Sequence, residues 1–103
     1  MVNSMKSLTF NGNEVKLRFK SYQNNGKLAV LMNFITDEES AGVITVNLDC
    51  PLQSDRFAFI DENNLPGIGQ WLQDNGIAFP LGYSQRSGFC TYHLYSFHLP
   101  TRL

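Results

Sequence analysis

The chain has 103 residues, of which 43% are hydrophobic and 17% charged, with a formal net charge of −1. This length leaves no room for a second core, so we predict a single domain over residues 1–103. The near-neutral charge argues against a protein that functions through many phosphate contacts. No apolar run approaches the ~20 residues that cross a bilayer, and residues 1–6 lack the apolar stretch of a secretion signal. We therefore expect no membrane association and a cytoplasmic location.

The first half of the chain predicts an antiparallel meander. A strand over residues 5–10 ends at Asn11-Gly12, a strong hairpin signal because both residues tolerate positive φ. The return strand over 14–22 alternates apolar and polar residues, which indicates one core face and one solvent face. Residues 27–35 are apolar on both faces and predict the central strand, and a β-branched run over 43–48 predicts its neighbour.

The second half predicts one short helix between further strands. Residues 56–60 form a short strand, and the helix runs over 65–75 with Asn64 as its cap. Three apolar side chains recur at helical spacing and define its buried face: Ile68, Trp71 and Leu72. A turn over 84–88 precedes an aromatic strand over 89–99, which Pro100 ends. The predicted fold class is α+β, an antiparallel β-sheet of about five or six strands with one short α-helix packed on it.

No catalytic or metal-binding constellation emerges from the residues. Cys50 and Cys90 are forty positions apart and lack the spacing of metal ligands, so we expect two reduced thiols. His93 lies an odd number of residues from both His98 and Cys90, and such separations on a strand point side chains to opposite faces. The Gly67-Ile68-Gly69 segment lacks the third glycine of a Gly-x-Gly-x-x-Gly motif and the lysine of a P-loop. We therefore interpret these glycines as packing features. We expect no enzymatic activity, no metal or other cofactor, and no small-molecule substrate.

The charges divide between the two parts of the chain. Five basic residues lie between Lys6 and Lys27 against one acid, and the strand over 14–22 carries three of them on one face together with an aromatic residue. This basic strand face consists of Lys16, Arg18, Lys20 and Tyr22. Such a strip could hold a single strand of nucleic acid, but lysines on an edge strand also prevent pairing with other chains.

Seven acids follow between Asp37 and Glu62 against one basic residue. The candidates for contact with a partner are Asp37, Glu38, Glu39, Asp61 and Glu62. Together they could present a negative surface that resembles nucleic-acid phosphate to a basic protein groove. The alternatives are that they are solvated loop acids, and that Asp61 and Glu62 favour the positive amino-terminal end of the helix.

About a third of the chain, in residues 69–78, 80–82 and 87–95, resembles an uncharacterised family of small proteins from phages and conjugative elements of gut bacteria. Within that family, the length and sequence resemble metagenome-derived type II-A anti-CRISPR proteins. The resemblance implies non-enzymatic inhibition of a type II CRISPR effector nuclease inside the bacterial host cell, and we expect a monomer. The residues leave open whether an exposed strand edge pairs with a second chain.

The charge pattern suggests how such an inhibitor would act. RNA-guided nucleases hold nucleic acid in basic channels, so an acidic surface could compete with target DNA. An alternative function is that of a nucleic-acid-binding accessory protein of a mobile genetic element, which would use the basic strand face.

Overall fold

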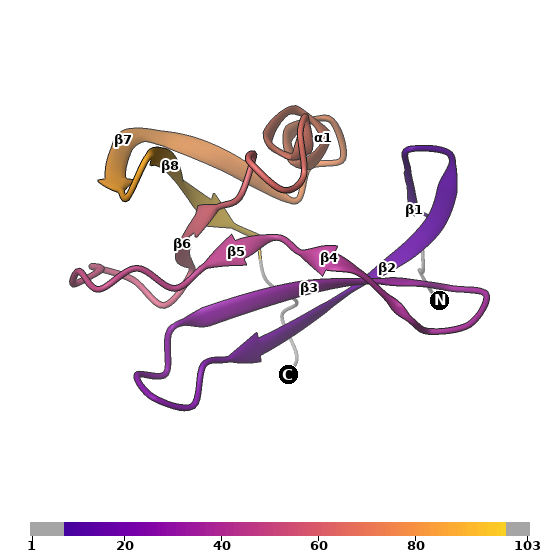
Figure 1. Ribbon diagram of the computed structural model, residues 1–103, viewed down its shortest axis with the longest axis horizontal. Helices are drawn as coiled ribbons and strands as arrows, with labels where there is room; N and C mark the ends of the chain where they lie inside the picture. The colour runs from indigo at the N-terminus through magenta and orange to yellow at the C-terminus, as the bar shows by residue number, and fades with distance from the viewer. Residues whose placement is uncertain (1–7, 99–103) are drawn as a thin grey trace.

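A computed structural model describes residues 8–98, which form one α-helix and eight strands in two antiparallel sheets of four strands each (Figure 1). In spatial order, sheet A contains β1 (Leu8–Phe10), β2 (Asn13–Ser21), β3 (Leu28–Phe34) and β4 (Ser40–Val43). In spatial order, sheet B contains β5 (Thr45–Val46), β6 (Phe57–Ile60), β8 (Cys90–Phe97) and β7 (Ala78–Ser87). The α+β class is confirmed, while the predicted single sheet of about five or six strands is replaced by these two sheets.

Sheet A follows the predicted meander. Asn11 and Gly12 join β1 to β2 with φ angles of 52° and 83°, the positive values that a tight two-residue hairpin turn requires. The inward side chains of β2, such as Val15, are covered, whereas Arg18 and Lys20 are exposed on the outer face. β3 lies between β2 and β4 and is the central strand, as predicted. Residues 5–7 of the predicted first strand lie outside the described residues.

Ile44 transfers the chain from sheet A to sheet B. The predicted strand over 43–48 is wrong in its continuity, because β4 ends at Val43 and β5 begins at Thr45. The Ile44 N–H donates to the Val30 carbonyl in sheet A (2.8 Å), and its own carbonyl accepts from the Asp61 N–H beside sheet B (2.8 Å). Its side chain is fully buried. One residue therefore hydrogen-bonds on both sides of the junction.

The carboxy-terminal strands are longer than the sequence indicates. β7 continues through Ser87, so the predicted turn over 84–88 shortens to Gly88 and Phe89. The strand tolerates Pro80 because β7 is at the edge of sheet B, where a missing N–H need not break a ladder. Pairing with β8 is irregular between Pro80 and Ser84 and regular again up to Ser87. Leu99 and Pro100 lie outside the described residues.

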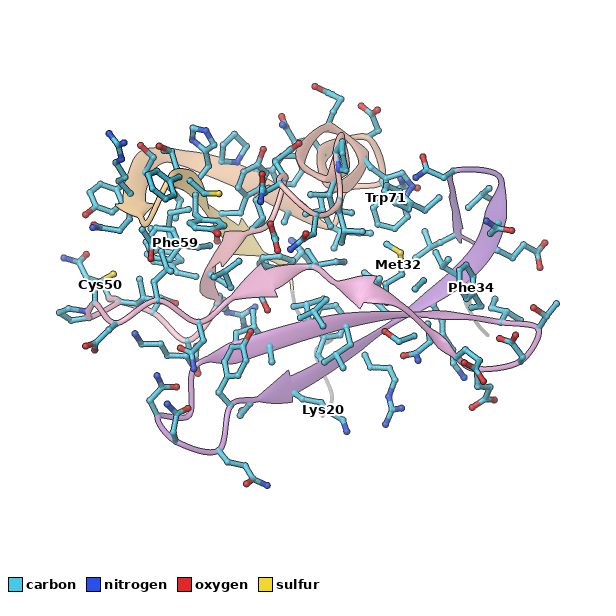
Figure 2. All side chains as sticks on the ribbon, viewed as in Figure 1. Lys20, Met32, Phe34, Cys50, Phe59 and Trp71 are labelled. Atoms are coloured by element: carbon cyan, nitrogen blue, oxygen red, sulfur yellow. The ribbon has the colours of Figure 1, made fainter. Side chains whose placement is uncertain are left out.

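The main core lies between the two sheets and is closed by α1 (Ile68–Asp74), as Figures 1 and 2 show. Met32 from sheet A and Ile68 from the helix are both fully buried in this core. Trp71 packs edge-on against Phe10, with ring centroids 5.4 Å apart, and its indole N–H donates to the Thr9 carbonyl at 2.7 Å. The helix thus connects β1 of sheet A to sheet B. A smaller cluster around Phe59 lies on the other face of sheet B.

Candidate functional site

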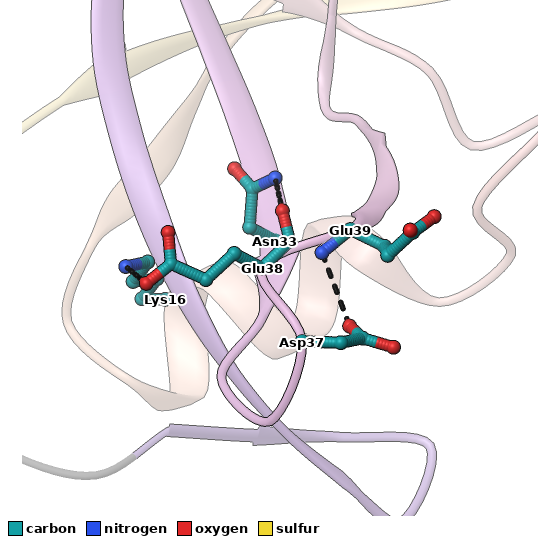
Figure 3. A network of polar contacts seen from close by, with 5 residues as sticks. All are labelled: Lys16, Asn33, Asp37, Glu38 and Glu39. Carbon is teal, nitrogen blue, oxygen red and sulfur yellow. Dashed lines mark hydrogen bonds and ion pairs between the residues drawn. The ribbon is translucent and has the colours of Figure 1, made fainter.

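The acidic turn, which we define as Asp37, Glu38 and Glu39, connects β3 to β4 (Figure 3). The Asp37 carboxylate accepts a hydrogen bond from the Glu39 N–H at 3.1 Å, and the Glu38 carbonyl accepts one from the Asn33 side-chain amide at 3.0 Å. The Glu38 carboxylate lies 3.4 Å from the Lys16 ammonium. All three acids are exposed, so the turn holds three carboxylates in a hydrogen-bonded frame at the molecular surface.

Glu38 has an unusual backbone conformation for its residue type. Its φ is +61°, in the left-handed region that glycine or asparagine adopts at lower cost. Its ion pair with Lys16 is an exposed one, with 72% of the Glu38 side chain accessible, and such pairs contribute about 0–1 kcal/mol. The ion pair is therefore a weak reason for glutamate at this position. A role for the carboxylate outside the fold would be a stronger one.

Asp61 is a structural residue, and its burial argues against the predicted role as a partner-binding acid. Its exposure is 8%, and its two carboxylate oxygens accept hydrogen bonds from the backbone and side-chain N–H groups of Asn64 at 3.1 and 2.7 Å. The Asp61 carbonyl also accepts from the Leu65 N–H. Asp61 therefore fixes the bend that leads into α1.

Glu62 takes the capping role predicted for Asn64. Its two carboxylate oxygens accept from the backbone N–H groups of Gly67 (2.9 Å) and Gly69 (2.6 Å), which point out of the start of α1. Gly67 is the residue at the N-cap position, with φ 85° and no side-chain cap of its own. A half-buried carboxylate at the positive end of a helix is stabilised by both the hydrogen bonds and the helix dipole. The alternative interpretation of these two acids as helix-start residues is thus supported, and Glu62 is committed to the fold.

The acids do not form one continuous patch. The acidic turn lies at one end of the long axis of the molecule, while Asp49 and Asp55 are in the β5–β6 loop at the other end (Figure 1). The backbone N–H of Asp61 bonds to the carbonyl of Ile44. Ile44 follows Glu39 by five residues of extended chain, which at ~3.3 Å per residue separates Asp61 from the acidic turn by about 16 Å. Of the predicted partner-binding residues, only the acidic turn remains both exposed and clustered.

The basic strand face is only partly available. Lys16, Arg18 and Lys20 share the outer face of β2, where Lys20 extends away from the molecule (Figure 2). Lys16 is paired with Glu38, and the half-buried Tyr22 bonds through its hydroxyl to the Thr45 hydroxyl at 3.1 Å. A tyrosine held in this way is a poor stacking platform for a base. Within residues 8–98, the exposed cations of this face without an ion pair are Arg18 and Lys20.

No reactive constellation is assembled in the described part of the chain. Among residues 8–98, no three His, Cys, Asp or Glu side chains lie close enough to hold a metal ion, and both cysteines are free. An open groove of about 470 Å³ lies between the β2–β3 turn and residues 52–57. Lys27 lines it, but its ammonium donates to the carbonyls of Leu48 (2.7 Å) and Cys50 (2.5 Å) and so anchors the β5–β6 loop. No described helix is long and apolar enough to span a membrane.

An exposed apolar surface on the β7–β8 hairpin was not anticipated. It consists of Phe79, Leu81, Tyr83 and Phe89, which are 48%, 43%, 52% and 100% exposed. The sequence carried a signal, since Gly88-Phe89 fits a two-residue hairpin turn with glycine first. The turn predicted over 84–88 concealed this signal.

Together, the fold and these surfaces define a small two-sheet α+β domain whose described residues present charged and apolar patches. The sequence model described as Domain of unknown function (DUF4313) matches residues 16–103, and the chain belongs to this family. The match begins within β2 and includes every later element of both sheets. Comparisons with curated proteins and with solved structures give no match.

Proposed function

We propose that this protein is a non-enzymatic inhibitor of a type II CRISPR effector nuclease, and that it binds through the acidic turn. The observation that carries the proposal is the placement of Glu38, an exposed acid with φ +61° at the tip of a hydrogen-bonded turn. The resemblance of the chain's length and sequence to type II-A anti-CRISPR proteins, within the family of mobile-element proteins described above, supplies the class of partner.

Electrostatics supplies the mode of binding. The nuclease holds its guide–target duplex in a positively charged channel and reads a short duplex motif through arginine side chains. A rigid turn with three carboxylates, one of them shared with Lys16, would compete there with the phosphates of target DNA. Because the contact involves charges, it accelerates association and weakens as salt rises.

A cleavage assay with purified nuclease, guide and target DNA tests the proposal. Excess inhibitor should abolish cleavage, and the triple variant Asp37→Asn, Glu38→Gln, Glu39→Gln should lose at least tenfold in potency while preserving side-chain shape and the Asp37 acceptor. The matched control is Asp49→Asn with Asp55→Asn, which removes two exposed acids at the other end of the molecule and should leave potency unchanged. Undiminished cleavage at large excess of the native protein would reject the proposal.

Glu38→Gly separates stability from function at the tip of the turn. Glycine relieves the left-handed backbone, so the variant should be as stable as the native protein or more stable, by up to about 1 kcal/mol. The same change removes the carboxylate and should reduce inhibition. A Glu38→Gly protein with full inhibitory potency would show that the glutamate side chain is not the contact.

The alternative, a nucleic-acid-binding accessory protein, rests on Arg18 and Lys20 alone, because Lys16 and Tyr22 have partners within the fold. It predicts retardation of DNA or RNA with a shallow salt dependence, since the slope follows the number of phosphates neutralised. Arg18→Ala with Lys20→Ala should then abolish retardation.

A further inference from the structure

The β7–β8 hairpin leaves its most apolar residue at its tip. Gly88 and Phe89 form the two-residue turn between Ser87 and Cys90, with Gly88 at φ +63°. Phe89 is 100% exposed, so it contributes nothing to the core of its own chain. A rigid hairpin that carries a fully exposed phenylalanine loses little conformational entropy when a partner covers it.

The edge of sheet B beside this residue is also open. The edge strands β1, β4 and β5 contain 3, 4 and 2 residues, whereas the edge strand β7 contains 10. Short edges are a common protection against pairing with other chains, and a long edge lacks it. Pro80 and the irregularity up to Ser84 interrupt the first half of β7, so the regular free edge is Ser84–Ser87.

Charge does not oppose the approach of an identical surface. From Ile77 to His98 the sequence contains no Asp or Glu, and Arg86 is the one Lys or Arg. Depletion of charge together with enrichment in aromatic residues is typical of the centre of a protein interface. A nucleic acid or an anionic surface would select a basic patch, which this hairpin lacks.

We propose that β7 pairs with β7 of a second copy of this chain, in antiparallel orientation about a two-fold axis. Identical strands paired in this way form a self-complementary interface. Pairing centred on Gln85 places Gln85 opposite its own copy and Ser84 opposite Arg86, which keeps the two arginines from facing each other directly. The same register sets Phe89 of each copy beside Leu81 of the other, an apolar side chain that is 43% exposed in the single chain.

The exposed area is large enough to contribute substantially. Tyr83 and Phe89 are 52% and 100% exposed, so together they offer about 300 Å², taking about 200 Å² for one aromatic side chain. A stable interface of standard size needs about 800 Å² from each partner, so these two residues supply more than a third. Leu81 and the paired backbones add to this area.

The dimer would leave the acidic turn free. In Figure 1 the β7–β8 turn and the β3–β4 turn lie at opposite ends of the longest axis, which measures 38 Å. Pairing through β7 therefore directs the two acidic turns away from the contact. This inference does not rest on the proposed function and differs from the monomer expected from the sequence.

Sedimentation equilibrium of the full chain across a wide concentration range tests the pairing. The mass should rise from 11.7 kDa to twice that value, and hydrogen exchange of the Ser84–Ser87 amides should slow as the dimer forms. Phe89→Asp should raise the dimer Kd at least tenfold, because each copy loses a buried ring and gains a carboxylate. Ile35→Asp is the matched control, since Ile35 is 41% exposed near the β3–β4 turn, and it should leave the Kd unchanged.

Two results would overturn the inference. One is a native protein that keeps the mass of a single chain at all concentrations. The other is a dimer that resists Phe89→Asp but dissociates with Ile35→Asp. A monomeric protein whose nuclease inhibition is lost with Phe89→Asp would assign the hairpin to the nuclease and reject self-pairing, while normal inhibition by a dimer-deficient variant would leave the proposed function intact.

Discussion

Replacement of Gly69 by alanine should destabilise the protein, although the same change stabilises most helices. Alanine is favoured over glycine in a helix by about 1 kcal/mol. Here, a methyl group at position 69 would overlap a carboxylate oxygen of Glu62 and lie 2.5 Å from the Tyr95 hydroxyl oxygen. The helix offers no reason for glycine at this position, since its φ is an ordinary one, so the need for glycine is entirely one of space.

The magnitude follows from the hydrogen bonds that the methyl group displaces. Glu62 accepts from the Gly67 and Gly69 N–H groups, and hydrogen bonds to charged groups contribute about 1.5–3 kcal/mol each. Loss of one of these, or equivalent overpacking, minus the gain in helix propensity gives a net loss of about 0.5–2 kcal/mol. For a chain of this size, that lowers the Tm by about 2–16 °C.

Urea unfolding of four proteins measures this effect: native, Gly69→Ala, Glu62→Ala and the double variant. Gly69→Ala should cost less stability in the Glu62→Ala background than in the native protein, because alanine at position 62 removes one of the two side chains that the new methyl group would meet, while the Tyr95 hydroxyl remains. Gln70→Ala, at an exposed neighbouring position, should change stability by less than about 0.5 kcal/mol. A Gly69→Ala protein as stable as the native one would refute the steric reasoning.

Two further predictions concern the pH dependence of stability and the loop anchor. Burial raises the pKa of Tyr95 above 10.0; the negative charge of Glu62 also raises this pKa, and the hydrogen bond from Gln73 partly lowers it. The folded protein therefore holds the Tyr95 proton more tightly than the unfolded chain does. The free energy of unfolding should fall as the pH rises above 10.0. In urea unfolding at increasing pH, Tyr95→Phe should remove part of this alkaline loss of stability. Part of the remainder comes from Tyr92, whose pKa a hydrogen bond to Cys90 also raises. If the variant loses stability with pH as steeply as the native protein, Tyr95 is not the group responsible. Lys27→Met should cost about 2 kcal/mol by removing the donor to the Leu48 and Cys50 carbonyls and should speed hydrogen exchange in the β5–β6 loop, whereas the exposed Lys20→Met should do neither.

Local patterns predicted the elements that local physics determines. Asn11-Gly12 produced the first hairpin because positive φ at both positions selects that turn, and the alternation around Val15 set which face of β2 is buried. The buried face of α1 followed from the spacing of Ile68 and Leu72. These signals depend only on neighbours within a few residues.

The division into two sheets depends on contacts that no local pattern encodes. Residues 43–48 read as one β-branched strand, and the break at Ile44 arises because its two backbone groups bond to Val30 and Asp61, far apart in the sequence. Asp61 and Glu62 were recognisable as helix-start acids, but their burial depends on how the chain bends back over α1. The acidic turn was visible as three consecutive acids, whereas its separation from the other acids required the fold.

The junction at Ile44 has a consequence for how the molecule comes apart. Because consecutive peptide groups are tied to different layers, sliding either layer by one residue would rupture bonds in both. Denaturation should thus proceed as a single concerted event, and inserting one residue beside Ile44 should be far more damaging than inserting one into the β5–β6 loop.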